Sequence, residues 1–246
     1  MATRLGVLVP SGNPTVEPEL YRMAPRAVTL HFARMASVGE GPPGAPDGME
    51  QRTLGYLDSV PAAARTLADV GLAAMVLAHT GVSYLTGFGR EEPLLERLNA
   101  LAGAPATTAA RAILAALAHL GVRRLALATP YPDAIAAAGR AYWEAAGLEV
   151  VRHHRLEGVA NIYAETTDRV LALGRAADAA DAEAVLISGT GLPTAEAVAP
   201  LERALGKPVV TSQSATLWWA LRAARVTEPV RGWGRLLLDA SAPGTR

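Results

Sequence analysis

The sequence contains no cysteine among its 246 residues. Disulfide bonds, thiolate metal sites and covalent catalysis by a thiol are therefore excluded. Net charge is also missing, because 23 Lys and Arg residues balance 23 Asp and Glu residues. No overall field draws the chain to nucleic acid or to an anionic membrane, so a charged partner must be recognised locally.

Long hydrophobic runs are absent too, although half of the residues are hydrophobic. No apolar run approaches the roughly 18 to 20 residues that a helix needs to cross a bilayer. Residues 1–8 show no basic region followed by an apolar stretch and a small-residue cleavage site. We therefore expect a globular protein of the cytoplasm, without a membrane partner.

Short apolar runs alternate with amphipathic, alanine-rich stretches, which is typical of an α/β fold. The runs predict strands at residues 5–9, 28–33, 74–78, 125–128, 149–153, 184–187 and 208–210. The stretches between them predict helices at residues 107–120, 134–146, 165–179, 194–205 and 214–224. Because the strands are apolar almost throughout, we expect parallel sheets covered by helices on both faces.

An internal repeat organises the chain. RLGVLVPS at residues 4–11 parallels RLALATPY at 124–131, and AMVLAHTG at 74–81 parallels AVLISGTG at 184–191. PATT at residues 105–108 likewise parallels PVVT at 208–211. The repeat predicts two similar Rossmann-like halves related by a pseudo-twofold axis, with the active cleft between them.

The second half is predicted to be inserted between two segments of the first. Residues 1–115 together with 208–246 are expected to form the first half, and residues 116–207 the second. Residues 39–48, GEGPPGAPDG, are too rich in Gly and Pro for a helix or a central strand. They predict either a surface loop or a lid over the site.

Several predicted strands run into turns of small and hydroxylic residues. Such turns lie at residues 10–15, 79–83, 129–131 and 188–191. Free N–H groups at a helix start, hydroxyls and the helix dipole favour a bound carboxylate or phosphate. No Walker loop, Gly-x-Gly-x-x-Gly pattern or metal-ligand spacing is present in the sequence. We therefore expect a small carboxylate as partner, with no nucleic acid, no metal and no cofactor.

These motifs resemble the maleate isomerase and arylmalonate decarboxylase family of the aspartate/glutamate racemase superfamily. VPSGNPTVEPE at residues 9–19 is similar to the isomerases' N-terminal loop, whose asparagine stands at Asn13 here and holds a substrate carboxylate. TPY at residues 129–131 matches the motif whose tyrosine, here Tyr131, binds carboxylate. LISGTGLPT at residues 186–194 resembles the motif of the second catalytic cysteine, and Asn161 matches an asparagine that contacts substrate.

The resemblance also shows where this chain departs from the family. The two positions at which the family places catalytic cysteines hold His79 and Gly189 here. Two-base racemisation through cysteines and thiolate addition to maleate are therefore excluded. His79 is the predicted cleft residue that can transfer a proton near neutral pH. We predict a catalytic set of His79, Tyr131 and Gly189, and a substrate-binding set of Ser11, Asn13, Thr80, Gly81, Asn161, Ser188, Thr190 and Gly191.

Three functions remain open at this point. The favoured one is a cofactor-independent, decarboxylase-like lyase that acts on a small carboxylic or dicarboxylic acid through an oxyanion pocket. The alternatives are an isomerase related to maleate isomerases or racemases, and a carboxylate-binding protein without catalysis. Trp218 and Trp219 are expected to pack in the core or at a subunit interface, so a homo-oligomer also remains open.

Overall fold

The computed structural model describes residues 2–37 and 41–239 and folds them into two parallel sheets with helices around them. The strands are β1 (Thr3–Pro10), β2 (Val28–Met35), β3 (Ala74–Leu77), β4 (Ala106–Thr108), β5 (Arg124–Thr129), β6 (Glu149–Arg155), β7 (Ala184–Ile187) and β8 (Val209–Thr211). The helices are α1 (Val16–Met23), α2 (Met49–Ala68), α3 (Thr80–Thr86), α4 (Glu92–Ala102), α5 (Ala109–His119), α6 (Asp133–Ala145), the 3₁₀ helix η1 (Ile162–Ala164), α7 (Thr167–Ala177), α8 (Ala195–Leu205), α9 (Ser212–Ala223) and α10 (Arg235–Leu238).

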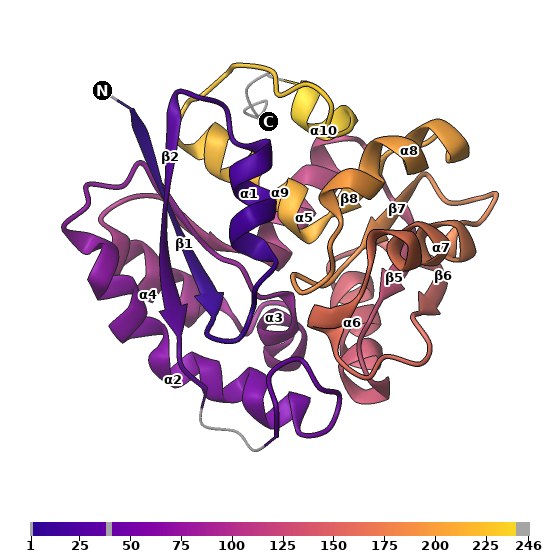
Figure 1. Ribbon diagram of the computed structural model, residues 1–246, viewed down its shortest axis with the longest axis horizontal. Coiled ribbons are helices and arrows are strands. Elements are labelled where there is room, and N and C mark those ends of the chain that lie inside the picture. Colours follow the sequence, from indigo (N-terminus) through magenta and orange to yellow (C-terminus); the bar gives the residue numbers. More distant parts are fainter. Residues whose placement is uncertain (1, 38–40, 240–246) are drawn as a thin grey trace.

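Both sheets have the same topology. Their strand orders are β2-β1-β3-β4 and β6-β5-β7-β8, and every neighbouring pair is parallel. Figure 1 shows the first sheet on the left and the second on the right, with helices around each. The α/β class and the two similar halves predicted from the repeat are confirmed.

The central strands β1, β3, β5 and β7 are mostly apolar because both faces of each sheet are covered there, whereas the edge strands β2 and β6 keep exposed polar residues. Side chains alternate between faces along a strand. Leu5 and Val7 of β1 therefore pack in a core cluster with α1 and α5, whereas Leu8 packs with Tyr56 and Leu98 in the cluster under α2 and α4. This double coverage removes the polar alternation that an exposed sheet face would show.

The predicted strands are all present, and the five predicted helices are present with slightly different ends. Strand β4 and helices α2, α4, η1 and α10 were not predicted, and helices were expected after the turns at residues 10–15 and 79–83, where α1 and α3 lie, but without bounds. The segment 41–48 is irregular as expected, while Gly39 and Glu40 lie outside the described residues.

The two sheets do not follow the predicted boundary at residue 208. Residues 208–246 were assigned to the first half, but Val209–Thr211 of β8 pair with β7 in the second sheet. The helix that follows, α9, instead contacts α1 and α5 of the first half. Residues 240–246 lie outside the described part. As a division into folding units, the boundary stays a prediction.

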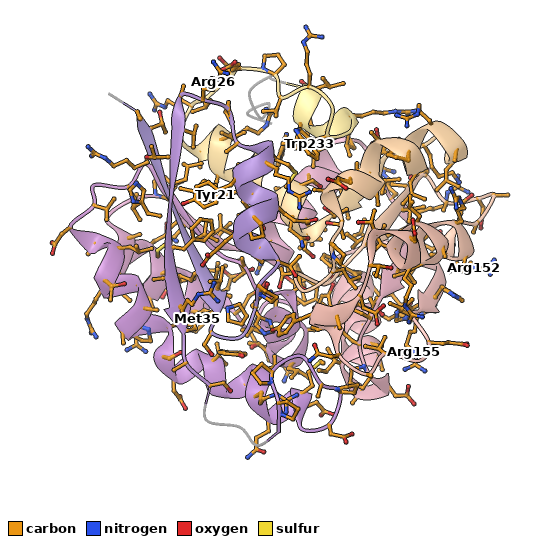
Figure 2. The ribbon with its side chains drawn as sticks, in the orientation of Figure 1. Tyr21, Arg26, Met35, Arg152, Arg155 and Trp233 are labelled. Carbon is orange, nitrogen blue, oxygen red and sulfur yellow. The ribbon has the colours of Figure 1, made fainter. Side chains whose placement is uncertain are left out.

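The carboxyl ends of the strands gather on one side of the molecule. Figure 2 labels Met35 and Arg155, the last residues of β2 and β6, and both lie in the lower part of the view. Ligands bind at such strand ends in open α/β sheets, so this side is where a site is expected. Among the described residues, the helices are too short or too polar to traverse a lipid bilayer.

Candidate active site

A small cavity lies between the two halves. It is lined by Gly44, Met49, Arg52, Thr53, Tyr56 and His79 from the first half and by Tyr131, Ile162, Tyr163, Thr190 and Gly191 from the second. Its volume of about 30 Å³ has room for about two water molecules. Four predicted site residues, His79, Tyr131, Thr190 and Gly191, thus meet in one cavity.

His79 reaches this cavity from the end of β3. It is the N-cap of α3, and its Nδ1 accepts a hydrogen bond of 3.4 Å from the backbone N–H of Val82. Since Nδ1 is used in this way, Nε2 is the nitrogen that can serve a ligand. The ring packs beside Tyr56, with 5.3 Å between centroids. Burial lowers the pKa of His79 to about 4, so the imidazole is neutral at neutral pH.

Tyr131 faces the cavity from the second half. Its hydroxyl lies 2.8 Å from the Thr80 hydroxyl, which belongs to the first half. Burial raises the pKa of Tyr131 to about 12, so its hydroxyl keeps its proton and can donate to an anion. The two predicted residues therefore form a hydroxyl pair that joins the halves beside His79.

The turn after β7 carries four of the predicted residues, Ser188, Gly189, Thr190 and Gly191. The Ser188 hydroxyl is hydrogen-bonded to the Tyr84 hydroxyl, and the carbonyl of Thr190 accepts from Asn13 at 3.1 Å and from Gln213 at 3.2 Å. The contacts of Tyr84 and Asn13 cross from one half to the other. They fix the position of the turn relative to the first half.

Gly189 has a backbone conformation that disfavours other residues. Its φ is +147°, and a Cβ added here would lie 2.9 Å from the ring of Pro130 and 3.7 Å from the Tyr131 hydroxyl. The backbone N–H of Gly189 donates to Ser212 at 3.0 Å. The position thus contributes backbone beside Tyr131 but no side chain, and its predicted catalytic role stays a prediction.

The remaining predicted binding residues lie around the cavity rather than in its lining. The Asn13 amide donates to Thr190, and its Oδ1 accepts from the N–H groups of residues 15 and 16, which starts α1. Ser11 is exposed, and its hydroxyl bonds to Tyr56. Gly81 lies against the His79 ring, because a Cβ added there would be 3.1 Å from that ring. Their contact with a substrate stays a prediction.

Asn161 lies at the edge of the cavity and holds the segment 41–48. Its Nδ2 donates to the Pro43 carbonyl at 2.9 Å, and the next backbone N–H, of Ile162, donates to the Gly44 carbonyl at 2.9 Å. The first-half segment is thereby fastened to η1 of the second half. Gly44 of this segment lines the cavity.

Sequence reasoning missed Arg52, Thr53 and Tyr56, since α2 was not predicted. Tyr163 was missed as well, although it follows the predicted Asn161 by two residues. Burial raises the pKa of Tyr56 and of Tyr163, so both hydroxyls stay neutral. A usable signal was the spacing of Thr53, Tyr56 and Val60, which is that of one buried helix face. In the described part of the chain, no three His, Asp or Glu side chains are grouped as a metal site.

The sequence is similar to known proteins of one family. The family model described as arylmalonate decarboxylase matches residues 5–237. The chain is 36% identical over 186 residues to an arylmalonate decarboxylase from Bordetella bronchiseptica, covering 73% of this chain and 77% of the relative. It is 30% identical over 248 residues to a maleate isomerase from Nocardia farcinica, covering 97% of each.

A solved structure adds a likeness in three dimensions. It is a variant of the Nocardia farcinica maleate cis-trans isomerase with a covalently bound succinylcysteine intermediate. The TM-score is 0.85 at 26% identity, over 97% of this chain and 99% of the other. The likeness thus extends over both halves.

Proposed function

The chain belongs to the arylmalonate decarboxylase family, whose matched relatives are decarboxylases and maleate isomerases, and we propose that it decarboxylates a small malonate-type acid without a cofactor. The observation that carries the proposal is the cavity itself. One buried imidazole, His79, shares it with Tyr131, whose hydroxyl pairs with Thr80. A single proton donor and a set of oxyanion donors are what this reaction needs.

The residues suggest the following sequence of events. One substrate carboxylate is held by the Tyr131 hydroxyl and by the turn at Thr190. The bond from the reacting carbon to the other carboxylate breaks, CO₂ leaves, and the electron pair remains as an enediolate. When Nδ1 of His79 takes up a proton, its bond to the Val82 N–H is lost, and the imidazolium then gives its Nε2 proton to that carbon and becomes neutral. Donors that are already in place stabilise the charge as it develops.

The low pKa of His79 makes the proton supply depend on the substrate. Without a ligand, burial keeps the imidazole neutral at neutral pH. A malonate dianion beside the ring favours the imidazolium and raises its pKa. Substrate binding is therefore expected to be accompanied by proton uptake, which loads the acid that the reaction consumes.

The test measures CO₂ release from phenylmalonate by the wild type, His79→Gln and His31→Gln. His31 is a matched control because it lies on β2, where it bonds to Thr29 outside the cavity lining. We expect His79→Gln to lose roughly 10²- to 10⁴-fold in kcat and His31→Gln to keep wild-type activity. Equal rates for all three proteins would contradict the role of His79. Saturable malonate binding without CO₂ release or proton exchange at the α-carbon would instead indicate a carboxylate-binding protein.

An isomerase is the second candidate, favoured by the near-complete match to the Nocardia farcinica maleate isomerase. A related isomerase structure holds a succinylcysteine, and this chain has no cysteine with which to form one. We therefore expect no conversion of maleate to fumarate. Conversion that is unaffected by iodoacetamide would overturn the decarboxylase proposal in favour of an isomerase that does not use a thiol.

A further inference from the structure

The turn after β7 is held by a buried side chain that lies outside the cavity lining. Gln213 is 1% exposed and belongs to the first turn of α9. Its Nε2 donates to the Thr190 carbonyl at 3.2 Å and to the Leu192 carbonyl at 2.8 Å, and its Oε1 lies 3.2 Å from the Thr194 hydroxyl. A single amide thus contacts three residues of the segment 188–194, and both of its N–H groups are used.

The segment 188–194 has little internal bonding that could fix its shape. In the described chain, the backbone bond within it runs from the Leu192 N–H to the Gly189 carbonyl, at 3.1 Å. Gly189 and Gly191 both belong to it, and glycine loses more backbone freedom on folding than other residues. The conformation of the segment therefore depends on side chains that reach it from other elements, as Gln213 does.

The equivalent turn of the first half is held differently. The repeat that aligns PATT at residues 105–108 with PVVT at 208–211 places Ala110 opposite Gln213. Alanine has no polar side-chain group, and the turn after β3 is instead capped by its own His79, whose side chain accepts from a backbone N–H of α3. The second half has no side chain at this place in its turn, and α9 provides the bonds.

The bonds to Thr190 determine which way one peptide group faces. The carbonyl of Thr190 accepts from Gln213 and from Asn13, so both of its lone pairs are directed at side chains outside the cavity lining. The carbonyl and the N–H of a trans peptide point in opposite directions. The Gly191 N–H is therefore turned away from these two amides, toward the cavity that Thr190 and Gly191 line, and no described residue accepts from it.

We propose that Gln213 is a positioning residue for the decarboxylation. It holds the Thr190–Gly191 peptide with its N–H toward the cavity, where that N–H donates to the carboxylate that becomes the enediolate. The same bonds turn away the Thr190 carbonyl, whose partial negative charge would repel a carboxylate. The inference rests on the proposed function for the reaction, and on the hydrogen bonds of Gln213 for the orientation of the peptide. Gln213 itself touches no reacting atom and moves no proton.

The first experiment measures CO₂ release from phenylmalonate by the wild type and Gln213→Met. Methionine is close to glutamine in size but cannot donate a hydrogen bond. Because the displaced N–H serves the enediolate more than the substrate, we expect a loss of roughly 10- to 100-fold in kcat with little change in KM. The pH profile, which reports on His79, should keep its shape. A variant with the wild-type kcat would overturn the role of Gln213.

Asn99→Leu is the matched control. Asn99 also donates to two carbonyls, those of Leu95 and Ala106, and accepts from the Ala106 N–H, but it links α4 to β4 outside the cavity lining. We expect this variant to keep the wild-type kcat per folded molecule, with the folded fraction measured by urea unfolding. An equal loss of kcat in Asn99→Leu and Gln213→Met would show that Gln213 acts only through stability.

Amide hydrogen exchange of the ligand-free proteins separates the positioning from the proposed function. We expect the segment 188–194 to exchange roughly tenfold faster in Gln213→Met than in the wild type, while the strands keep their rates. Unchanged exchange in this segment would overturn the positioning, whatever the activity. Faster exchange, in a protein whose wild type releases no CO₂ from phenylmalonate, would support the positioning of the turn and count against the proposed function.

Gln213→Glu decides the matter if Gln213→Met does not fold. A protonated glutamic acid donates one O–H, which replaces one of the bonds to Thr190 and Leu192, whereas its carboxylate donates none. Glu19 bonds to the same Thr194 hydroxyl, so burial and like charge both raise the pKa of the introduced carboxyl. We expect the kcat of this variant, relative to the wild type, to be higher at pH 5 than at pH 9. The same ratio at both pH values would contradict donation by this side chain.

Discussion

The turns that follow β3 and β7 occupy equivalent places in the two halves but have different chemistry. Each follows a four-residue buried strand, and each contains Thr-Gly, at Thr80 and Thr190. Before that dipeptide stands His79 in one turn and Gly189 in the other. His79 caps α3 directly, whereas α8 begins only at Ala195, after a longer connection.

The surroundings explain this difference. The imidazole at residue 79 packs beside the ring of Tyr56, so a large side chain is accommodated. At residue 189, the ring of Pro130 and a φ of +147° leave no place for a side chain. One turn therefore offers an imidazole and the other offers only backbone. A duplicated scaffold has become a one-sided site, which suits a reaction with one proton transfer.

Exchanging the two residues gives the strongest test of this asymmetry. The double variant His79→Gly/Gly189→His carries an imidazole on the opposite wall. We expect it to lose at least roughly 100-fold in kcat/KM for phenylmalonate, because the introduced imidazole would meet Pro130 and could not lie on the correct side of the carbon. Activity within tenfold of the wild type would show that the two walls are equivalent. Circular dichroism checks that the variant is folded.

The same asymmetry should appear in stability as a function of pH. The native pKa of His79 is depressed to about 4, whereas an unfolded histidine titrates near 6.5. Below pH 6.5 the unfolded chain binds a proton that the native site refuses, so stability is lost as the pH falls from about 6.5 to 4. The loss attributable to His79 is about 3 kcal/mol.

Urea unfolding of the wild type and His79→Gln at several pH values measures this contribution. Subtracting the two curves removes the contributions of other titrating groups. We expect the variant to lose less stability over that pH range. Parallel curves would mean that His79 titrates normally and is not desolvated as the structure indicates.

How much the sequence predicts differs between the fold and the site. Apolar runs ending in small residues located seven strands, because a strand buried on both faces must be apolar. The three-residue strand β4 is too short to give such a signal. Helix α2 contains Gly55 and Pro61, which local propensity disfavours, and it is held in place by packing of Tyr56, Val60 and Leu67 in the core.

The site residues also fall into a group that the sequence predicts and a group that it does not. His79, Tyr131 and Thr190 follow recognisable strands, so their convergence could be predicted from topology alone. Arg52 and Tyr163 could not, since they reach the cavity from α2 and η1, whose positions depend on contacts between the halves. Asn13 was predicted to bind substrate, but its amide holds the Thr190 carbonyl, a contact that depends on the exact distance between two separate turns.

Adding one methyl group at Gly189 tests the steric part of the comparison. We expect Gly189→Ala to cost about 2 to 3 kcal/mol in unfolding free energy, because the Cβ meets Pro130 and the conformation disfavours it. Gly206→Ala is the control: its φ is also positive, at +72°, but no atom lies within 4 Å of the added Cβ. That variant should lose about 1 kcal/mol. Equal losses in guanidinium unfolding would show that crowding by Pro130 has no effect.

The smallest expected effect concerns a hydrogen bond that both turns make to the opposite half. Each carries a buried hydroxyl bonded to a tyrosine of the opposite half, Thr80 to Tyr131 and Ser188 to Tyr84. Double-mutant cycles with Thr80→Val and Tyr131→Phe, and with Ser188→Ala and Tyr84→Phe, should each give a coupling of about 1 kcal/mol. Neither cycle removes His79 or adds a side chain at Gly189. Similar coupling energies would therefore mean that the two halves have kept equivalent contacts with each other although the residues at positions 79 and 189 differ. A coupling at Thr80 alone would instead place the contact between the halves on the same side as the proton donor.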